Sequence, residues 1–292
     1  LITSDQYNRL LNMDLSEFIR FIGESGYHEE IHTLSHSYHE IELIEQALTQ
    51  NLAKTYRNIL SISPGGLRDL AERYFTRYDI ENVMLILRGC QFQIPPDKIR
   101  AVLIPAGILD PVKLDQLLAI RSVTEIINHL SSWTGHHILS SGISGEYKRG
   151  TFASLENDLY IAYYSNLLAD AKSGYQGGDV IIPHLRFEID IQNIRNIFRL
   201  RAGSNVRDIT PYMIPGGYKT PNDFQRLYGI TDREEFVNEL SNAGILALLT
   251  KALGTLRCDK SVCDTDAAEF IWSRWAAHKT PLYTIVLAVN TM

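Results

Sequence analysis

Two matching stretches of the chain underlie the prediction of its fold: YDIENVMLILR at residues 78–88 and IDIQNIRNIFR at residues 189–199. In each stretch, most of the positions between three shared polar residues are hydrophobic. Self-similarity of this kind is the signature of an internally repeated architecture. The shared positions are an aspartate, an asparagine and an arginine: Asp79, Asn82 and Arg88 in the first stretch, and Asp190, Asn193 and Arg199 in the second.

Further matches lie on either side of these stretches and in the same order. Downstream, Ile-Pro-x-Gly occurs at 104–107 and again at 214–217, which matches Pro105 with Pro215 and Gly107 with Gly217. Upstream, a pattern of two short helices occurs three times. Each unit would contain short helices, a long helix, the Asp-x-x-Asn helix and Ile-Pro-x-Gly. These four features in constant order predict three units of one design, at residues 1–107, 108–217 and 218–292. The last unit is expected to be truncated, because the chain ends where its Asp-x-x-Asn helix would begin.

The spacing of apolar residues is helical along the whole chain. Hydrophobic positions recur every three or four residues, and strict alternation is nearly absent. Long helices are expected near 41–60, 152–172 and 264–279. The sequence therefore predicts an all-α protein.

The Asp-x-x-Asn helix carries apolar residues around most of its circumference, which predicts a buried helix. We expect Asp79 and Asn82 to lie at the start of this helix and to satisfy exposed backbone N–H groups there. Direct contact of these side chains with a partner is the alternative.

Composition narrows the classes of function. The chain has 292 residues, of which 45% are hydrophobic, so a packed core is expected rather than disorder. Its 28 basic and 34 acidic residues give a net charge of −6, which disfavours nucleic acid as a partner. No apolar run approaches the roughly 20 residues of a membrane helix. Three cysteines are too few for a disulfide framework, and an intracellular location is expected.

One motif indicates a competing chemistry. His28-Glu29-Glu30-Ile31-His32 matches His-Glu-x-x-His, in which two imidazoles on one helical face bind zinc and the glutamate acts as a base. A zinc-dependent hydrolase is therefore the alternative function. The extended form of the motif would need Gly and His where Ser35 and Tyr38 stand, and the segment is not repeated elsewhere in the chain. Adventitious metal binding and a plain solvated histidine face are the simpler interpretations.

Other candidate sites are weaker. Cys258 and Cys263 lie close to several aspartates, but their spacing is too wide for the usual metal-binding pair. No phosphate-binding glycine loop is present, and no cofactor is predicted. Three arginines, Arg195, Arg199 and Arg201, could form a basic patch; pairing with Glu188 and Asp190 is the simpler prediction.

With these motifs in their order, the chain resembles the C subunits of archaeal A-type ATP synthases. That family also includes related proteins of bacterial rotary ATPases and the d subunits of eukaryotic vacuolar proton pumps. The Asp-x-x-Asn helix, the Ile-Pro-x-Gly turn and the leading unit at 7–27 carry the resemblance, which extends over essentially all of the chain. The region 73–107 is the most specific part.

The resemblance implies three similar helical domains around a pseudo-threefold axis, in the form of a funnel. It also implies a non-catalytic rotor subunit, without catalytic or metal-binding residues, on the cytoplasmic face of the membrane. Its expected partners are the central-stalk subunits and the membrane proteolipid ring, and any contact with the membrane would be indirect, through the ring. Such an adaptor would couple ATP synthesis or hydrolysis to ion transport. A helical scaffold for some other assembly is a weaker alternative.

Overall fold

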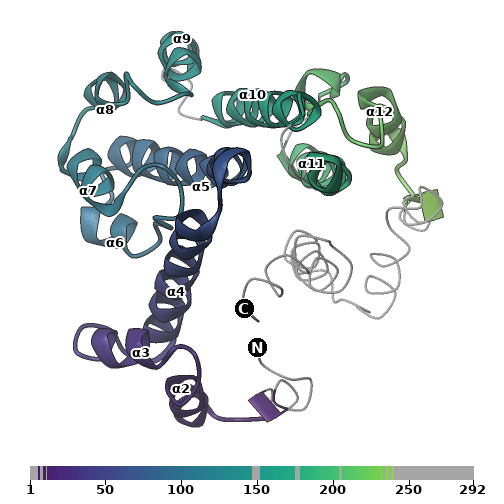
Figure 1. Cartoon of the computed structure of the whole chain (residues 1–292). Helices are drawn as coiled ribbons and strands as arrows, with labels where there is room; N and C mark the ends of the chain where they lie inside the picture. Colours follow the sequence, from purple (N-terminus) through teal and green to yellow (C-terminus); the bar gives the residue numbers. More distant parts are fainter. Residues whose placement is uncertain are drawn as a thin grey trace. The chain divides into compact units, whose positions relative to one another are not determined.

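The computed structural model describes residues 12–146, 152–174, 178–203 and 206–232, together with residues 6, 9, 10, 235, 236, 238 and 239. The chain divides into two compact units, Leu1–Phe152 and Ala153–Met292 (Figure 1). The described residues form helices and turns without a strand, so the all-α prediction is confirmed. The division into three sequence units is a different partition of the chain and stays a prediction.

The described residues of the first unit form eight helices, of which two are long (Figure 1). Short helices precede and follow the long pair. The helices are α2 (Leu15–Gly23), α3 (His28–Leu34), α4 (Glu40–Ile62), α5 (Gly65–Gln91), α6 (Pro96–Arg100), α7 (Pro111–Ala119), α8 (Val123–His129) and α9 (His136–Glu146).

Helices α2 and α3 pack against the first part of α4. Asp14 starts α2 with a capping box, in which its side chain accepts from the backbone N–H of Glu17 and the Glu17 side chain accepts from the N–H of Asp14. A small apolar core lies between these three helices. It contains Ile22 from α2, Ile31 and Leu34 from α3, and Leu43 and Ala47 from α4.

Helix α5 is the centre of the first unit, because it contacts α4, α6, α7 and α8. Residues around most of its circumference are buried over its second half, including Val83, Met84 and Leu87. The prediction of a buried Asp-x-x-Asn helix is therefore confirmed. The predicted position at a helix start is wrong. Helix α5 begins at Gly65, well before Asp79, because Ser63 and Pro64 end α4 and the next helix starts directly after them.

The second unit also contains two long helices. Helices α10 (Ala153–Lys172) and α11 (Gly178–Gly203) pack against each other, and α11 also contacts α12 (Pro221–Gly229). A short 3-10 helix, η2 (Thr210–Tyr212), lies against α12. Helices α11 and α12 share an apolar core, which includes Phe187, Ile191, Ile194 and Ile197 of α11 and Phe224 of α12.

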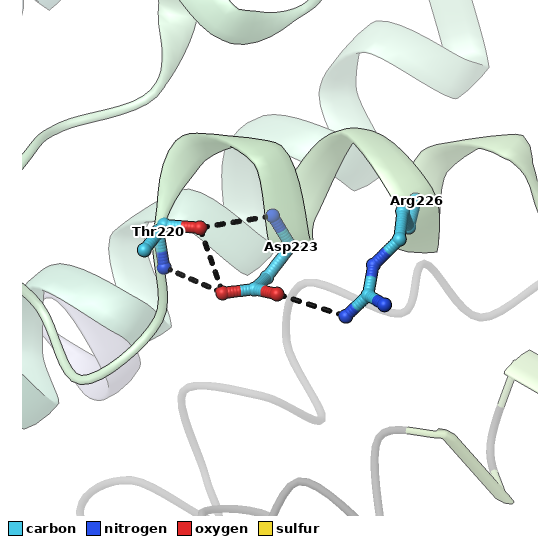
Figure 2. A network of polar contacts seen from close by, with 3 residues as sticks. All are labelled: Thr220, Asp223 and Arg226. Atoms are coloured by element: carbon cyan, nitrogen blue, oxygen red, sulfur yellow. Dashed lines mark hydrogen bonds and ion pairs between the residues drawn. The ribbon is translucent and has the colours of Figure 1, made fainter.

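Helix α12 begins with a complete capping box, which Figure 2 shows. The Thr220 hydroxyl accepts from the backbone N–H of Asp223 (3.3 Å), and the Asp223 carboxylate accepts from the Thr220 hydroxyl (2.8 Å) and N–H (2.9 Å). Arg226 donates to the other carboxylate oxygen at 2.8 Å. In the first unit, Asp110 caps α7 at the corresponding place, with a bond of 2.8 Å from the N–H of Lys113. Each cap is followed by a proline at the first helical position, where the missing N–H costs nothing.

Two of the three predicted long helices lie in the described residues, and both are confirmed. Helix α4 covers the stretch predicted near 41–60, and α10 covers the stretch predicted near 152–172. The helix predicted near 264–279 lies outside the described residues.

Candidate functional site

Asp79 lies within α5 and binds the backbone of a turn far along the sequence. One carboxylate oxygen accepts from the N–H of Ile108 and the other from the N–H of Leu109, both at 2.9 Å. The side chain is fully buried. Because a carboxylate can only accept, two N–H donors are the partners that such a buried group requires.

Asn82, one turn further along α5, binds the beginning of the same turn. Its amide nitrogen donates to the carbonyl of Ile104 (2.7 Å), and its amide oxygen accepts from the N–H of Ile104 (2.8 Å). Asn82 is also fully buried. We call this arrangement, Asp79 and Asn82 holding residues 104–109, the first clamp. It joins α5 to the segment that leads into α7.

The second unit contains the same arrangement, which we call the second clamp: Asp190 and Asn193 of α11 hold residues 214–219. Asp190 accepts from the N–H groups of Tyr218 (3.1 Å) and Lys219 (3.2 Å). Asn193 donates to the carbonyl of Ile214 (2.9 Å) and accepts from its N–H (2.7 Å). Both side chains are fully buried. The repeated sequence motif therefore corresponds to a repeated three-dimensional joint.

The glycines of Ile-Pro-x-Gly let the turn approach the carboxylate. A Cβ at Gly107 would collide with the Asp79 carboxylate, and a Cβ at Gly217 would collide with that of Asp190. Glycine is needed at both positions because the backbone comes closer than any side chain allows. Gly216 has a further reason, since its φ of +103° is a conformation that other residues rarely adopt.

Burial determines the electrostatics of both clamps. Desolvation raises the pKa of Asp79 to about 6, although the N–H groups of Leu109 and Ile108 and the charge of Lys113 oppose the shift. Desolvation likewise raises the pKa of Asp190 to about 7, against its two N–H bonds and Lys219 and with help from the negative charge of Asp223. The effect of desolvation outweighs those that lower the pKa, because each carboxylate has N–H donors but no ion-pair partner among the described residues.

The remaining matched residues occupy less equivalent places. Arg88 is half-buried in the last turn of α5, whereas Arg199 is exposed on α11. Pro105 is half-buried and Pro215 is exposed. The two aspartate–asparagine pairs and the two glycines therefore define the shared joint, and the arginines and prolines do not.

The arginines of α11 do not form the predicted pairs with Asp190, whose oxygens bind the Tyr218 and Lys219 backbone instead. Arg201 donates to three backbone carbonyls at the end of α12, at distances of 2.6 to 3.1 Å. Its guanidinium also lies 4.2 Å from the ring centre of Phe236. Desolvation lowers the pKa of Arg201. Arg201 therefore caps the C-terminus of α12 rather than contributing to a basic patch.

The His-Glu-x-x-His segment forms the seven-residue helix α3. The rings of His28 and His32 lie 6.2 Å apart on its exposed side, followed by His36 at the same spacing. Glu29, the base that a peptidase would use, forms a close ion pair with Lys54 of α4, and this pair lowers its pKa. Among the described residues, no group of three or more potential ligands could hold a metal ion. Cys258 and Cys263 lie outside those residues.

Sequence reasoning missed two features. The caps at Asp110 and Thr220 carry a signal that could have revealed them, a capping residue followed directly by proline. A cleft between α3, α4 and the α6–α7 segment carries none, because its polar residues are scattered through the sequence.

Comparison with known proteins decides the family. A family model of the ATP synthase (C/AC39) subunit matches residues 1–272 of this chain. The chain belongs to this family. Members of the ATP synthase (C/AC39) subunit family are structural, non-catalytic components of rotary complexes, and the chain is accordingly a rotary ATPase subunit.

Curated members of the ATP synthase (C/AC39) family with similar sequences are named as the C subunits of A-type ATP synthases. The protein from Archaeoglobus fulgidus is 30% identical over 241 residues, which cover 82% of this chain and 68% of the relative. That from Methanosarcina acetivorans is 35% identical over 244 residues, covering 82% and 65%. That from Methanosarcina mazei is 31% identical over 257 residues, covering 87% and 69%. The chain thus spans about two thirds of the length of these relatives. No helix in the described part of this C/AC39 protein is long and apolar enough to cross a membrane.

Proposed function

We propose that this chain is the adaptor that couples the central stalk of a rotary A/V-type ATPase to the membrane proteolipid ring. In this role it links ATP synthesis or hydrolysis to ion transport without catalysing a reaction itself. The observation that carries the proposal is the family match over residues 1–272, together with relatives named as the C subunits of A-type ATP synthases.

The proposed shape is a funnel of three similar helical units around a pseudo-threefold axis. The two clamps support it, because they repeat one joint between a long helix and the following turn. Each uses one aspartate and one asparagine, and these bind backbone groups at equivalent positions of the turn. The stretch that would form the third unit lies mostly outside the described residues.

Stiff joints suit an adaptor that transmits torque. A turn held only by water would yield when the helices on either side are loaded. Each clamp instead fixes its turn with four hydrogen bonds from fully buried side chains, and breaking them in the interior would leave unpaired polar groups, at a cost of about 1–3 kcal/mol each. The clamps therefore favour a mechanical role over a catalytic one.

We place the protein on the cytoplasmic face of the membrane, as a peripheral component that reaches the bilayer through the ring. Central-stalk subunits and the proteolipid ring are the proposed partners. The net charge of −6 favours protein partners over nucleic acid.

Affinity purification from detergent-solubilised membranes, with the full-length protein as tagged bait, tests the assignment. We expect both stalk subunits and the proteolipid to be recovered, and the unfused tag serves as the control. Recovery of neither partner would contradict the proposal.

Function is tested in membrane vesicles depleted of this protein. We expect ATP hydrolysis to continue while ATP-driven ion uptake is lost, and uptake to return when the purified protein is added. Uptake that is unaffected by depletion would contradict the coupling role.

A further inference from the structure

The first unit contains a cleft of about 610 Å³ that neither clamp uses. Helices α3 and α4 form a polar wall, with Glu30, Lys54 and Arg57 among its residues. The α6–α7 segment also lines the cleft, with Leu103 and Leu114 among its residues. The volume is within the range of about 300–1,000 Å³ found for ligand sites.

Glu30 is the unusual residue of this cleft. It is 94% buried, since only 6% of its surface is exposed, and its Oε2 has no hydrogen-bond partner among the described residues. The nearest cation is Lys54, whose Nζ lies 3.7 Å from Oε1 of Glu30. Lys54 is shared with Glu29, to which it is much closer. A buried carboxylate oxygen without a donor is costly, so the site lacks one partner.

We propose that this cleft binds the cationic head of an arginine or lysine side chain carried on an extended segment of a partner protein. The head donates to Oε2 of Glu30, and the aliphatic stem lies against Leu103 and Leu114. The inference does not depend on the assignment of stalk and ring as partners, because it is drawn from this cleft alone.

Charge selects a cation over an anion. Two carboxylates, Glu29 and Glu30, share the single ammonium of Lys54. Arg100 also lines the cleft but is paired with Asp97 and Asp115, so the charge around Glu30 is left negative. Arg57, one turn beyond Lys54 on α4, has no ion-pair partner in the described part of the chain. It is exposed and hydrated, however, so leaving it unpaired costs little. The energetic demand for a partner is therefore at Glu30.

The form of the cleft favours a side chain on a peptide over a free ion. The described residues offer no set of three metal ligands here, which disfavours a bound metal ion. A lysine or arginine places an apolar stem behind a charged head, and that pairing matches a cleft lined by a buried carboxylate and two leucines. The cleft is also larger than one side chain, which leaves room for the flanking backbone of a partner segment.

Methyl NMR of the full chain tests the proposal. The probe is the peptide Ac-Ala-Leu-Arg-Leu-Ala-NH2, and the control is the same peptide with neutral citrulline in place of arginine. We expect saturable shifts of the Leu103 and Leu114 methyl signals with the arginine peptide, and binding weaker by at least about tenfold with citrulline. No saturable shift, or equal binding of the two peptides, would overturn the proposal. Nα-acetyl-arginine amide that binds as tightly as the peptide would overturn the assignment to a protein segment.

Two variants of the cleft should change the affinity for the arginine peptide in opposite directions. Glu30→Gln keeps the size of the side chain and removes its charge, and we expect it to weaken binding of the arginine peptide by about tenfold or more. Lys54→Met removes the competing ammonium, so we expect tighter binding. Glu45→Gln, an exposed position on α4 outside the cleft, is the matched control and should leave affinity within about twofold. Unchanged affinity in Glu30→Gln, or weaker binding in Lys54→Met, would contradict the role of charge.

Discussion

Asn82 and Ile104 are joined by two hydrogen bonds that run in opposite directions, from the side-chain amide to the carbonyl and from the backbone N–H to the amide oxygen. Asn193 and Ile214 repeat this relationship in the second unit. Only a side chain that both donates and accepts can make the pair, and asparagine has the right length to do so from a buried helix face.

Replacement of Asn82 by aspartate tests the two-way bond. The carboxylate keeps the acceptor but faces the Ile104 carbonyl with a second acceptor, in a fully buried position. We expect the free energy of unfolding to fall by about 2–4 kcal/mol, measured by urea denaturation. Asn193→Asp should give a similar loss. Asn58→Asp, an exposed position on α4, is the control, and an equal effect there would contradict the explanation.

Alanine at Gly107 tests the close approach of the turn to Asp79. The added methyl would collide with the carboxylate, so we expect a loss of about 1–3 kcal/mol in the free energy of unfolding, and the same for Gly217→Ala. Gly26 has open space around its Cβ position. Gly26→Ala should therefore change stability by less than about 0.5 kcal/mol. If Gly107→Ala left the free energy of unfolding unchanged, the turn would have to lie further from Asp79 than the structure places it.

The clamp carboxyls predict a pH dependence of stability. The pKa of Asp190 is raised from 3.8 to about 7, and that of Asp79 to about 6. A raised pKa means that the folded state holds the proton more tightly. The stability from each group is therefore full below about pH 4 and is lost as pH rises through about 6 for Asp79 and 7 for Asp190. The slope is at most about 1.4 kcal/mol per pH unit for each group.

The measurement compares the wild type with Asp190→Asn in urea denaturation at pH 5, 6, 7 and 8. Asparagine cannot accept from both N–H groups, so we expect the variant to be less stable throughout. Its deficit should shrink as pH rises, because the wild type alone loses the stabilisation of the protonated carboxyl. A deficit that grows with pH would indicate an ordinary, ionised aspartate.

The capping box of α12 is tested by Thr220→Ala. This change removes the hydroxyl that donates to the Asp223 carboxylate and accepts from the Asp223 backbone N–H (Figure 2). We expect a loss of about 0.5–2 kcal/mol, measured by thermal denaturation. Thr220→Ser restores the hydroxyl and should recover most of the loss. The cap would have no role if alanine and serine gave the same midpoint.

The class of fold and the repeat could be predicted from the sequence, because helical spacing and the repeated Asp-x-x-Asn motif are local patterns. The start of α5 could not. Ser63 and Pro64 end α4, and Gly65 begins α5 directly, although two adjacent glycines are typical of a turn. Glycine disfavours a helix, and the burial of the rest of α5 outweighs that preference.

The partners of Asp79 and Asn82 could not be predicted from their own surroundings in the sequence. Both bind residues some 20 to 30 positions downstream, and only the folded chain brings these together. The matched Ile-Pro-x-Gly at 104–107 and 214–217 indicated that the turn mattered, but not which side chain required its glycine. The cleft at Glu30 depends on three separate segments and has no local signal at all.

Native-state hydrogen exchange of six backbone amides tests the central claim most directly. The claim is that one buried joint, built twice, holds a long helix rigidly to the turn that follows it. The amides belong to two matched sets: Ile104, Ile108 and Leu109 in the first clamp, and Ile214, Tyr218 and Lys219 in the second. We predict that all six exchange at least about a thousandfold more slowly than unstructured peptide, as slowly as the cores of α5 and α11. Exchange within about tenfold of the unstructured rate at either set would contradict the claim.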